Sequence, residues 1–433
     1  MNDGLESWGR YPRAKQCVIR LRDRNAPLPR FAGYALPRGN GRSYGDVCLN
    51  DAGSLLDGRG LDRFIAFDPE RGVLRCEAGV LLGTILDMFV PRGWFLPVVP
   101  GTRFVTVGGA IANDVHGKNH HVVGSFGGHV RSFELLRSNS TRRICSRDGN
   151  ADWFAATIGG LGLTGMITWA ELQLKPVPDA WFDTETIRFG RLDDFFELSS
   201  ESGRAFEYTV AWVDCSARGK ALGRGIFSRG NHAPASGNPR EPREGRLRIP
   251  FTPAFSLVSG PTLRAFNVLH FHNAPKTPRR ARVHYRPWLF PLDGIRNWNR
   301  MYGPRGFLQY QCVLPSATAP EAVRELLDRI AVSGSGSFLA VLKQFGTMRS
   351  PGLLSFPRPG ATLALDFANR GWATFELLDR LDNTVAAAGG AVYPAKDARM
   401  SGERFRAYFP AWQQYAQFID PAFSSGFWRR VMQ

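Results

Sequence analysis

The sequence predicts an α+β protein of two large domains, as its length, its composition and the order of its periodic segments indicate. The chain has 433 residues, 43% of them hydrophobic, which is enough for two cores. Strand-like and helix-like segments alternate through residues 72–177, and Pro176 and Pro178 then interrupt the chain. We therefore place one domain at 1–178, a second at 179–388, and a C-terminal segment at 389–433 that returns to the first.

The first domain is expected to contain a strand, a helix and a second strand in succession. Residues 73–80 (VLRCEAGV) are strand-like, 81–90 (LLGTILDMFV) have the apolar spacing of an amphipathic helix, and 94–102 (WFLPVVPGT) are extended and apolar. A short helical segment at 153–158 and an alternating strand at 166–177 (MITWAELQLKPV) follow.

The second domain mixes strands and helices. Residues 206–214 and 306–315 predict strands, and residues 320–332 and 372–388 predict helices, the second of which ends at Gly389-Gly390. The extended segment AVYPAKDAR follows it. A Pro/Gly/Arg-rich region at 228–261 is expected to be mobile.

Charge is the one unusual feature of the composition. The formal net charge of +17 favours an anionic partner, which a phosphate ester, a nucleic acid or an acidic lipid surface would equally provide. The basic runs at 240–248 and 278–286 are typical of solvated loops. The six cysteines are irregularly spaced, and no apolar run of 18 residues or basic N-terminal segment is present. We expect reduced thiols, no structural zinc and a soluble protein made in the cytoplasm.

A glycine-rich loop at 37–46 (PRGNGRSYGD) is a candidate phosphate-binding site. Small residues allow successive backbone amides to converge on an anion. The glycine spacing differs from that of a dinucleotide fingerprint, no helical segment is expected after the loop, and the Gly-Lys-Ser/Thr of a Walker A motif is absent. An ordinary glycine-rich turn is the alternative.

A second polar cluster at 100–121 (PGTRFVTVGGAIANDVHGKNHH) suits a flat cofactor with polar edges. Gly, Ala and Thr allow backbone atoms to approach a ring, and a nearby His or Lys supplies charge. Three histidines lie here, and a metal site is the alternative. No carboxylate at helical spacing completes it, and we expect no metal.

Together with GSFGGHVRS, GLTG, WNRMYGPRGFLQYQ, KQFG and YPAKDAR, these loops carry a family resemblance. The chain resembles the vanillyl-alcohol oxidase/para-cresol methylhydroxylase superfamily and, within it, the polyprenylphosphoryl-ribose oxidases. The resemblance runs through nearly the whole chain and thins at 228–285. It implies a two-domain FAD-binding fold of that type, α+β, with an antiparallel-sheet substrate domain.

The resemblance also implies which residues bind FAD. The loop at 37–47 would hold the pyrophosphate. Covalent members attach flavin through a histidine in the first loop, where this chain has Gly41-Arg42-Ser43-Tyr44, so we expect non-covalent FAD. The implied cofactor-binding residues are Gly39, Asn40, Gly41, Arg42, Ser43, Tyr44, Gly101, Thr106, Val107, Gly108, Gly109, Asn113, His116, Ile167 and Tyr393.

The implied reaction is oxidation of the ribose 2-hydroxyl of a polyprenylphosphoryl-β-D-ribose to the 2-keto sugar. A separate NAD(P)H-dependent short-chain reductase would complete epimerisation to the arabinose donor for cell-wall polysaccharide, and the enzyme would lie peripherally at the inner membrane, against its anionic surface. The implied catalytic residues are Lys396, as a cation near the flavin, together with His116, Lys118 and Tyr44. The implied substrate-binding residues are Gln309, Gln311, Lys343 and Lys118.

Each of these residues also has a purely structural interpretation. Gln309 and Gln311 share one face of a strand, which suits either a polar pocket or a solvated sheet face. Lys343 and Lys396, flanked by apolar residues, could simply extend their amines to solvent. Two other functions remain open: an FAD-dependent oxidase of a free polyol or aldonolactone, and a basic nucleic-acid-binding protein. The second is favoured by charge alone, and we expect no nucleic-acid partner.

Overall fold

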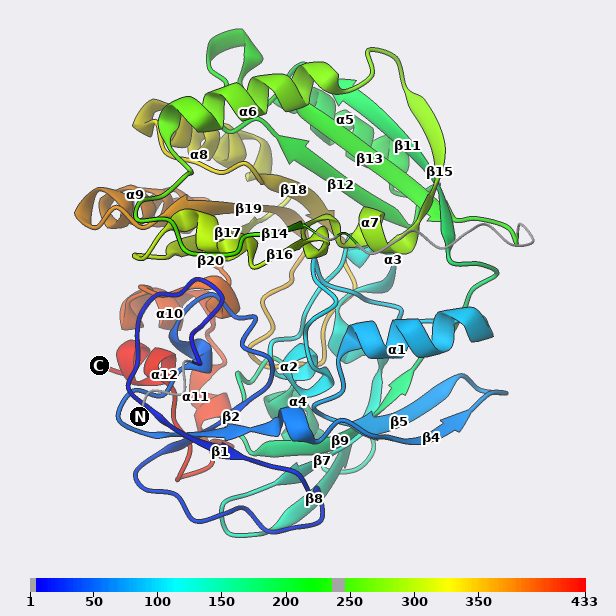
Figure 1. Cartoon of the computed structure of the whole chain (residues 1–433), viewed down its shortest axis with the longest axis vertical. Coiled ribbons are helices and arrows are strands. Elements are labelled where there is room, and N and C mark those ends of the chain that lie inside the picture. Colours follow the sequence, from blue (N-terminus) through cyan, green and yellow to red (C-terminus); the bar gives the residue numbers. More distant parts are fainter. Residues whose placement is uncertain (1–4, 236–244, 246) are drawn as a thin grey trace.

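A computed structural model describes residues 5–235, 245 and 247–433, and Figure 1 shows the fold. The lower half contains a five-stranded antiparallel sheet in the order β4-β5-β9-β7-β8 and a three-stranded parallel sheet in the order β1-β3-β2. The strands are β1 (Cys17–Arg20), β2 (Ala35–Arg38), β3 (Ser54–Asp57), β4 (Phe64–Asp68), β5 (Val73–Glu77), β7 (Val130–Leu136), β8 (Arg142–Ser146) and β9 (Met166–Gln173).

Short helices pack against the five-stranded sheet. In α1, Leu82, Ile85, Leu86 and Phe89 are buried at the spacing of one helical face, which is why this segment is an amphipathic helix. The lower half also contains a two-stranded antiparallel ladder of β6 (Trp94–Phe95) and β10 (Lys175–Pro176). The helices are α1 (Leu82–Phe89), α2 (Val107–Ala112), α3 (His120–Val123) and α4 (Ala151–Thr157).

The upper half is an eight-stranded antiparallel sheet in the order β15-β11-β13-β12-β18-β19-β17-β20. Its strands are β11 (Trp181–Phe189), β12 (Tyr208–Val213), β13 (Gly225–His232), β15 (Arg279–His284), β17 (Phe307–Leu314), β18 (Val341–Phe345), β19 (Gly360–Ala368) and β20 (Ala391–Val392). A two-stranded parallel pair, β14 (Leu247–Arg248) with β16 (Ile295–Arg296), lies apart from it.

Alternation along these strands divides the sheet into two unlike faces. Leu308, Tyr310 and Cys312 of β17 point into a core shared with helices on one face. Gln309 and Gln311, between them, point to the opposite face and line a cavity. The helices of this half are α5 (Leu192–Ser202), α6 (Gly260–Asn273), α7 (Tyr285–Leu289), α8 (Ala319–Ser333) and α9 (Trp372–Ala387), of which α5, α8 and α9 contribute to that core.

The C-terminal segment contacts both halves. Its first residues form β20, the edge strand beside β17, and the following helices are α10 (Gly402–Tyr408), α11 (Trp412–Ala416) and α12 (Gly426–Val431). Phe423 bridges to Ala35 of the parallel sheet, and Arg430 forms an ion pair with Asp46 at 2.8 Å. The segment therefore ties the upper sheet to the start of the chain (Figure 1).

The structure bears on two expectations about local structure. Within the region 228–261 that is expected to be mobile, residues 228–232 belong to β13, because they pair with β11 and residues 228–230 also pair with β12, and α6 begins at Gly260. Residues 236–244 and 246 of this region lie outside the described residues. Residues 279–284 of the second basic run form the edge strand β15 rather than a loop, since they pair with β11. Of the first basic run, residues 240–244 and 246 lie outside the described residues.

Three further observations concern the described part of the chain. All six cysteines are free. No group of three or more His, Cys, Asp or Glu side chains is arranged to hold a metal ion among these residues. Within the same residues, every helix is too short or too polar to cross a membrane.

Candidate active site

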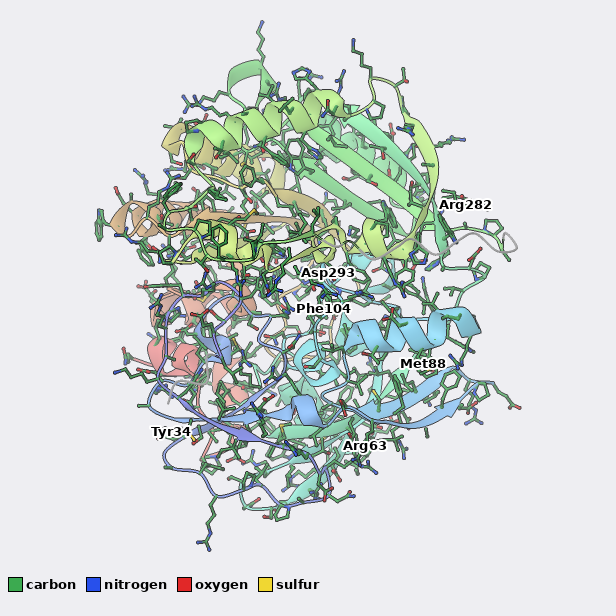
Figure 2. All side chains as sticks on the ribbon, in the orientation of Figure 1. Tyr34, Arg63, Met88, Phe104, Arg282 and Asp293 are labelled. Atoms are coloured by element: carbon green, nitrogen blue, oxygen red, sulfur yellow. The ribbon has the colours of Figure 1, made fainter. Side chains whose placement is uncertain are left out.

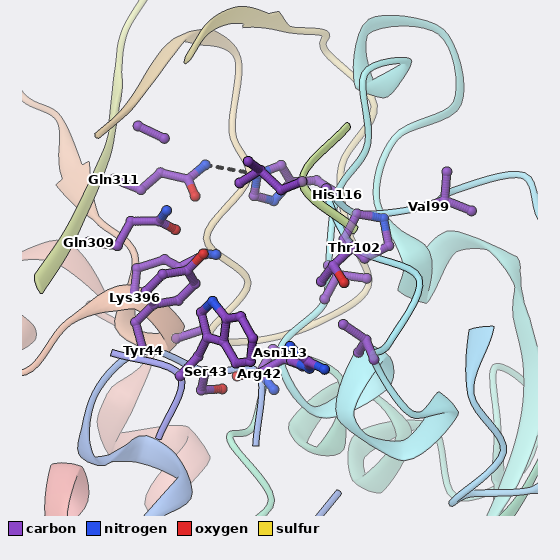
Figure 3. A pocket seen from close by; sticks show the side chains of 18 of the residues that line it. Arg42, Ser43, Tyr44, Val99, Thr102, Asn113, His116, Gln309, Gln311 and Lys396 are labelled. Carbon is purple, nitrogen blue, oxygen red and sulfur yellow. Dashed lines mark hydrogen bonds between the residues drawn. The ribbon is translucent and has the colours of Figure 1, made fainter. Parts of the chain in front are cut away.

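A cavity of about 820 Å³ lies between the five-stranded and eight-stranded sheets. This volume is within the range of small-molecule and cofactor sites. Figure 3 shows Gln309, Gln311 and Lys396 on one side, His116 and Thr102 on the other, and Arg42 with Asn113 below them. The cavity thus combines residues from distant parts of the chain.

The loop after β2 forms one wall of the cavity and leaves its backbone amides unused. The amides of residues 39–43 donate to no acceptor among the described residues, whereas the Ser43 carbonyl accepts from Trp8 and the Tyr44 amide donates to Ala395. Gly41 has φ +59°, a left-handed conformation that turns the chain here. Consecutive free amides of this kind make an anion-binding concavity.

The segment at 101–109 brings backbone close to the cavity rather than offering free amides. Thr106 Oγ1 accepts from the Gly109 amide at 3.2 Å, and the Gly108 amide donates to Ala78. A Cβ on Gly101 would meet nothing within 4 Å, so open cavity lies beside that backbone. Val107 differs from its neighbours: its side chain is fully buried in the core of the lower half and does not line the cavity, which corrects the expectation for this residue.

His116 is held in one orientation by a residue of the opposite domain. Its Nε2 lies 2.9 Å from the amide nitrogen of Gln311, which also donates to Thr362 Oγ1 at 3.1 Å (Figure 3). Burial and the nearby amine of Lys343 hold the pKa of His116 well below its usual value, so the ring is neutral. Because Nε2 accepts, Nδ1 carries the proton, and Nδ1 is buried without a partner among the described residues.

Three lysines project into the cavity and lack carboxylate partners within ion-pair distance among the described residues. Lys118 Nζ donates to the Leu289 carbonyl at 2.7 Å, and Lys343 Nζ donates to the Gly117 carbonyl at 3.3 Å. Burial is the main cause that lowers the pKa of Lys118 to about 7 and that of Lys343 to about 8. These lysine amines are therefore suited to binding an anion in the cavity.

Lys396 lies at the end of a 3-10 turn, Pro394–Lys396, that interrupts the extended segment predicted there. Its Nζ lies 4.0 Å from the centre of the Tyr44 ring. Burial lowers the pKa of Lys396 to about 7, and Asp366 partly opposes this shift. Burial also raises the pKa of Tyr44 well above its usual value, so the phenol stays protonated.

Asp366 does not line the cavity but contacts a residue of its wall, Gln309, and sequence reasoning missed it. It pairs with Gln309 across β17 and β19 and accepts a hydrogen bond from the Gln309 amide at 2.7 Å. Burial raises its pKa to about 7. The available signal was a single carboxylate within the apolar strand segment ALDFA, which is unusual for a buried strand.

Several aromatic residues of the cavity wall were not predicted from the sequence, because single aromatic residues are more often part of the core. Except for Val107, every residue expected to bind cofactor or substrate lines the cavity, as do several side chains not predicted. Asn113 Oδ1 lacks a partner among the described residues, and the Tyr393 hydroxyl donates to the Asn113 carbonyl. The unpredicted wall residues include Trp8, Trp212, Phe266, Trp288, Trp298 and Phe338.

The residues around the cavity fit FAD. The free amides at 39–43 suit a pyrophosphate. Four buried polar atoms of cavity residues lack partners among the described residues: Arg38 Nε, Arg42 Nε, Asn113 Oδ1 and His116 Nδ1. The Arg42 guanidinium also lies over Trp8, 4.0 Å from the ring centre, which fixes it beside the loop.

Comparison with known proteins agrees with this arrangement. Residues 33–146 match the FAD binding domain family. The chain is 37% identical, over 92% of its length and 88% of the relative's, to a decaprenylphosphoryl-beta-D-ribose oxidase of Mycolicibacterium smegmatis. It is 35% identical, over 81% of its length and the whole of the relative, to an uncharacterised protein of Streptomyces coelicolor. An L-gulonolactone oxidase of Mus musculus is 30% identical over 32% of the chain and 31% of its own length.

The fold, the cavity and the matched domain define an FAD-dependent oxidoreductase with an FAD-binding domain of the para-cresol methylhydroxylase type. The sequence identity of 37% with the Mycolicibacterium smegmatis oxidase extends over 92% of the chain and defines the family within this class. The chain belongs to the decaprenylphosphoryl-β-D-ribose oxidase family.

Proposed function

We propose that this enzyme oxidises the ribose 2-hydroxyl of a polyprenylphosphoryl-β-D-ribose to the 2-keto sugar. The observation that carries the proposal is the cluster of Lys118, Lys343 and Lys396 in the cavity, buried and without ion pairs among the described residues. A buried amine without a counterion is costly unless a bound anion compensates it. The phosphodiester of the substrate supplies that anion, and the similarity to the Mycolicibacterium smegmatis oxidase supports the same substrate class.

The chemical step requires a hydride acceptor beside the sugar, and FAD supplies one when bound. Lys396 stabilises negative charge that develops as the hydride is transferred, since it is preorganised by its contact with Tyr44. Its amine regains a full charge next to an anion, because an opposite charge raises the pKa that burial lowers.

The other polar groups orient the substrate. Lys118 and Lys343 hold the phosphate, and the carbonyls of Leu289 and Gly117 position their amines beforehand. Gln309, fixed by Asp366, presents its amide to the ribose hydroxyls. His116, held by Gln311, has a protonated Nδ1 available as a donor.

The cofactor is proposed to be non-covalent. Residues 39–46 contain no histidine. The ring nitrogen Nε2 of His116, the histidine that lines the cavity near Asn113, is already hydrogen-bonded to Gln311. Acid precipitation should release all of the FAD into the supernatant, and yellow colour that remains with the pellet would contradict the proposal.

Two partners are part of the same proposal. The keto sugar would pass to a separate NAD(P)H-dependent short-chain reductase, because inversion at C2 requires a hydride to return to the other face of the carbon. The lipid-linked substrate also implies peripheral contact with an anionic membrane surface, which the net charge of +17 favours. In isolation, the oxidase should accumulate the keto sugar.

Isotope substitution tests the reaction itself. Deuterium at C2 of a short prenylphosphoryl ribose should slow anaerobic flavin reduction several-fold, since that C–H bond breaks in the step observed. Deuterium at C3 is the matched control and should leave the rate unchanged. An isotope effect from C3, or from neither position, would refute oxidation at C2.

A further inference from the structure

Exposed apolar side chains are concentrated in one part of the molecule. Among the described residues, seven of the fourteen exposed large apolar side chains lie between 247 and 269. Phe251 and Phe255 are 70% and 71% exposed, Leu247 is 67% exposed and Leu269 is 62% exposed. Scattered exposed apolar residues are ordinary, but such a concentration is typical of an interaction surface.

The same stretch of chain has a one-sided charge. Residues 245–292 contain seven arginines and one lysine and no aspartate or glutamate, and three of these arginines, Arg280, Arg282 and Arg286, form ion pairs with carboxylates of other segments. Arg248, Arg264 and Lys276 are exposed and form no ion pair with any described residue. A surface rich in both apolar and cationic side chains complements an anionic lipid surface, because aromatic rings enter the headgroup region while arginines meet phosphates.

Helix α6 connects this surface to the cavity. Leu263, Asn267 and Phe271 are buried along one face of the helix, and Phe266 and His270 line the cavity. The remaining face presents Val268 and Leu269 to solvent. Figure 1 shows α6 and β14 on the same side of the eight-stranded sheet.

An aromatic rim marks the opening beside α6. Phe266 lines the cavity and is also 43% exposed, so it lies at the boundary between cavity and surface. Its ring lies 4.8 Å from that of Phe338, and the His270 ring lies 4.6 Å from that of Trp212. An apolar chain leaving the cavity here would pass aromatic side chains and reach the exposed face of α6.

We propose that segment 247–257 and the outer face of α6 form a docking surface for an anionic lipid bilayer, from which the polyprenyl chain enters the cavity beside Phe266. This inference rests on the proposed function for the identity of the lipid-linked substrate. A lipid surface is favoured over an acidic protein or a second copy of the chain because the apolar face adjoins the rim through which a lipid tail must pass.

Vesicle binding by the FAD-loaded full-length protein tests the proposal. The test variant is Phe251→Glu/Phe255→Glu/Leu269→Glu, and none of these residues lines the cavity. The control variant is Tyr34→Glu/Met88→Glu/Ile144→Glu, which replaces exposed apolar residues of the lower half and adds the same charge; Figure 2 shows Tyr34 and Met88 there. Each is sedimented with vesicles of phosphatidylcholine, with or without phosphatidylglycerol.

Wild-type and control proteins should bind the vesicles that contain phosphatidylglycerol, and the test variant should bind them at least about tenfold more weakly. Arg264→Glu/Lys276→Glu should also weaken binding, by about fivefold for each cation lost. The test variant should oxidise a short, water-soluble prenylphosphoryl ribose normally but lose turnover of the long-chain substrate presented in vesicles.

Equal vesicle binding by the test and control variants would overturn the proposal. So would the absence of wild-type binding to anionic vesicles, whether or not the surface instead supports a concentration-dependent dimer in ultracentrifugation. Failure of the proposed function has a different result: neither the short nor the long substrate would reduce the flavin, while sedimentation would still decide whether this surface binds lipid.

Discussion

We propose that the chemistry depends most on the buried residues Lys118, Lys343 and Lys396. Each is desolvated, and carbonyl oxygens or an aromatic ring replace only part of its hydration. Folding therefore costs free energy at these positions. The lysine contribution to stability rises with pH between about 7 and 10, because the unfolded chain then binds protons that the folded chain has released.

Replacing Lys396 should affect the chemical step more than substrate binding. We expect Lys396→Met to lower the rate of anaerobic flavin reduction about 10²- to 10³-fold at saturating substrate, since one preorganised electrostatic group is lost. Lys396→Arg should recover part of the rate. Stopped-flow absorbance with matched FAD content measures this, and a wild-type rate in the Met variant would remove Lys396 from the mechanism.

Binding of the phosphodiester should take up protons. Its charge raises the pKa of Lys118 from about 7 and that of Lys343 from about 8, so affinity should fall as pH rises between about 7 and 9. The diester does not titrate in this range, and calorimetry in buffers of different ionisation enthalpy counts the protons. Lys118→Met should reduce the uptake. Affinity and proton count that stay constant with pH would contradict the electrostatic role of these lysines.

At the scale of elements, we propose that the loop between β2 and the 3-10 turn Asp46–Cys48 provides the anion site. Its glycine conformation is needed: a Cβ on Gly41 would lie 2.0 Å from the buried guanidinium of Arg38. The free amides of residues 39–43 depend on this backbone conformation.

A bulky residue at Gly41 should therefore abolish FAD retention. Gly41→Val should give folded but colourless protein, because the loop can no longer adopt φ +59° beside Arg38. Gly219→Val is the control. Gly219 has φ +58°, and a Cβ added there would meet nothing within 4 Å. This substitution therefore causes a similar backbone strain of about 1–2 kcal/mol but does not affect the cavity. Full FAD occupancy in Gly41→Val, read from absorbance, would show that the cradle lies elsewhere.

The sequence predicted elements with strong periodicity and missed those without it. Helix α8 and helix α9 were predicted to within one residue at their ends, since their apolar positions recur on one face. Helix α6 was missed because it is apolar on its outer face as well as its inner one, which weakens the helical pattern. The order of the eight strands depends on contacts distant in sequence and could not be predicted from local patterns.

The candidate site, too, could be predicted from the sequence only in part. Glycine-rich segments and lysines in apolar surroundings were recognisable, and the two interpretations of Gln309 and Gln311 are resolved by their position on the cavity wall. Asp366 and the aromatic wall residues were not recognised. The carboxylate of Asp366 was unusual for an apolar strand, but only the pairing of β17 with β19 brings it to Gln309. Val107 does not line the cavity, because the residues of one helix face different directions and the side chain of Val107 faces the core.

At the scale of the whole molecule, residues of both halves line the candidate site, and packing joins the two halves. One apolar core includes Phe95 of the lower half with Phe182 and Tyr285 of the upper half. Asp293 accepts hydrogen bonds from Thr102 Oγ1 at 2.7 Å and from the Arg103 amide at 2.8 Å, and Figure 2 shows Asp293 near Phe104 between the halves. The anion loop and the lysines are thereby held at a fixed separation.

Substrate preference in single-turnover reduction tests the central claim most directly. The FAD-loaded protein is mixed anaerobically with a short prenylphosphoryl ribose, an alditol or an aldonolactone, and flavin bleaching is followed. The lysine cluster predicts rapid bleaching by the phosphoryl sugar alone, at least about a hundredfold faster than by either neutral compound, since both lack the anion that the lysines compensate. Faster bleaching by an alditol or a lactone would contradict the account.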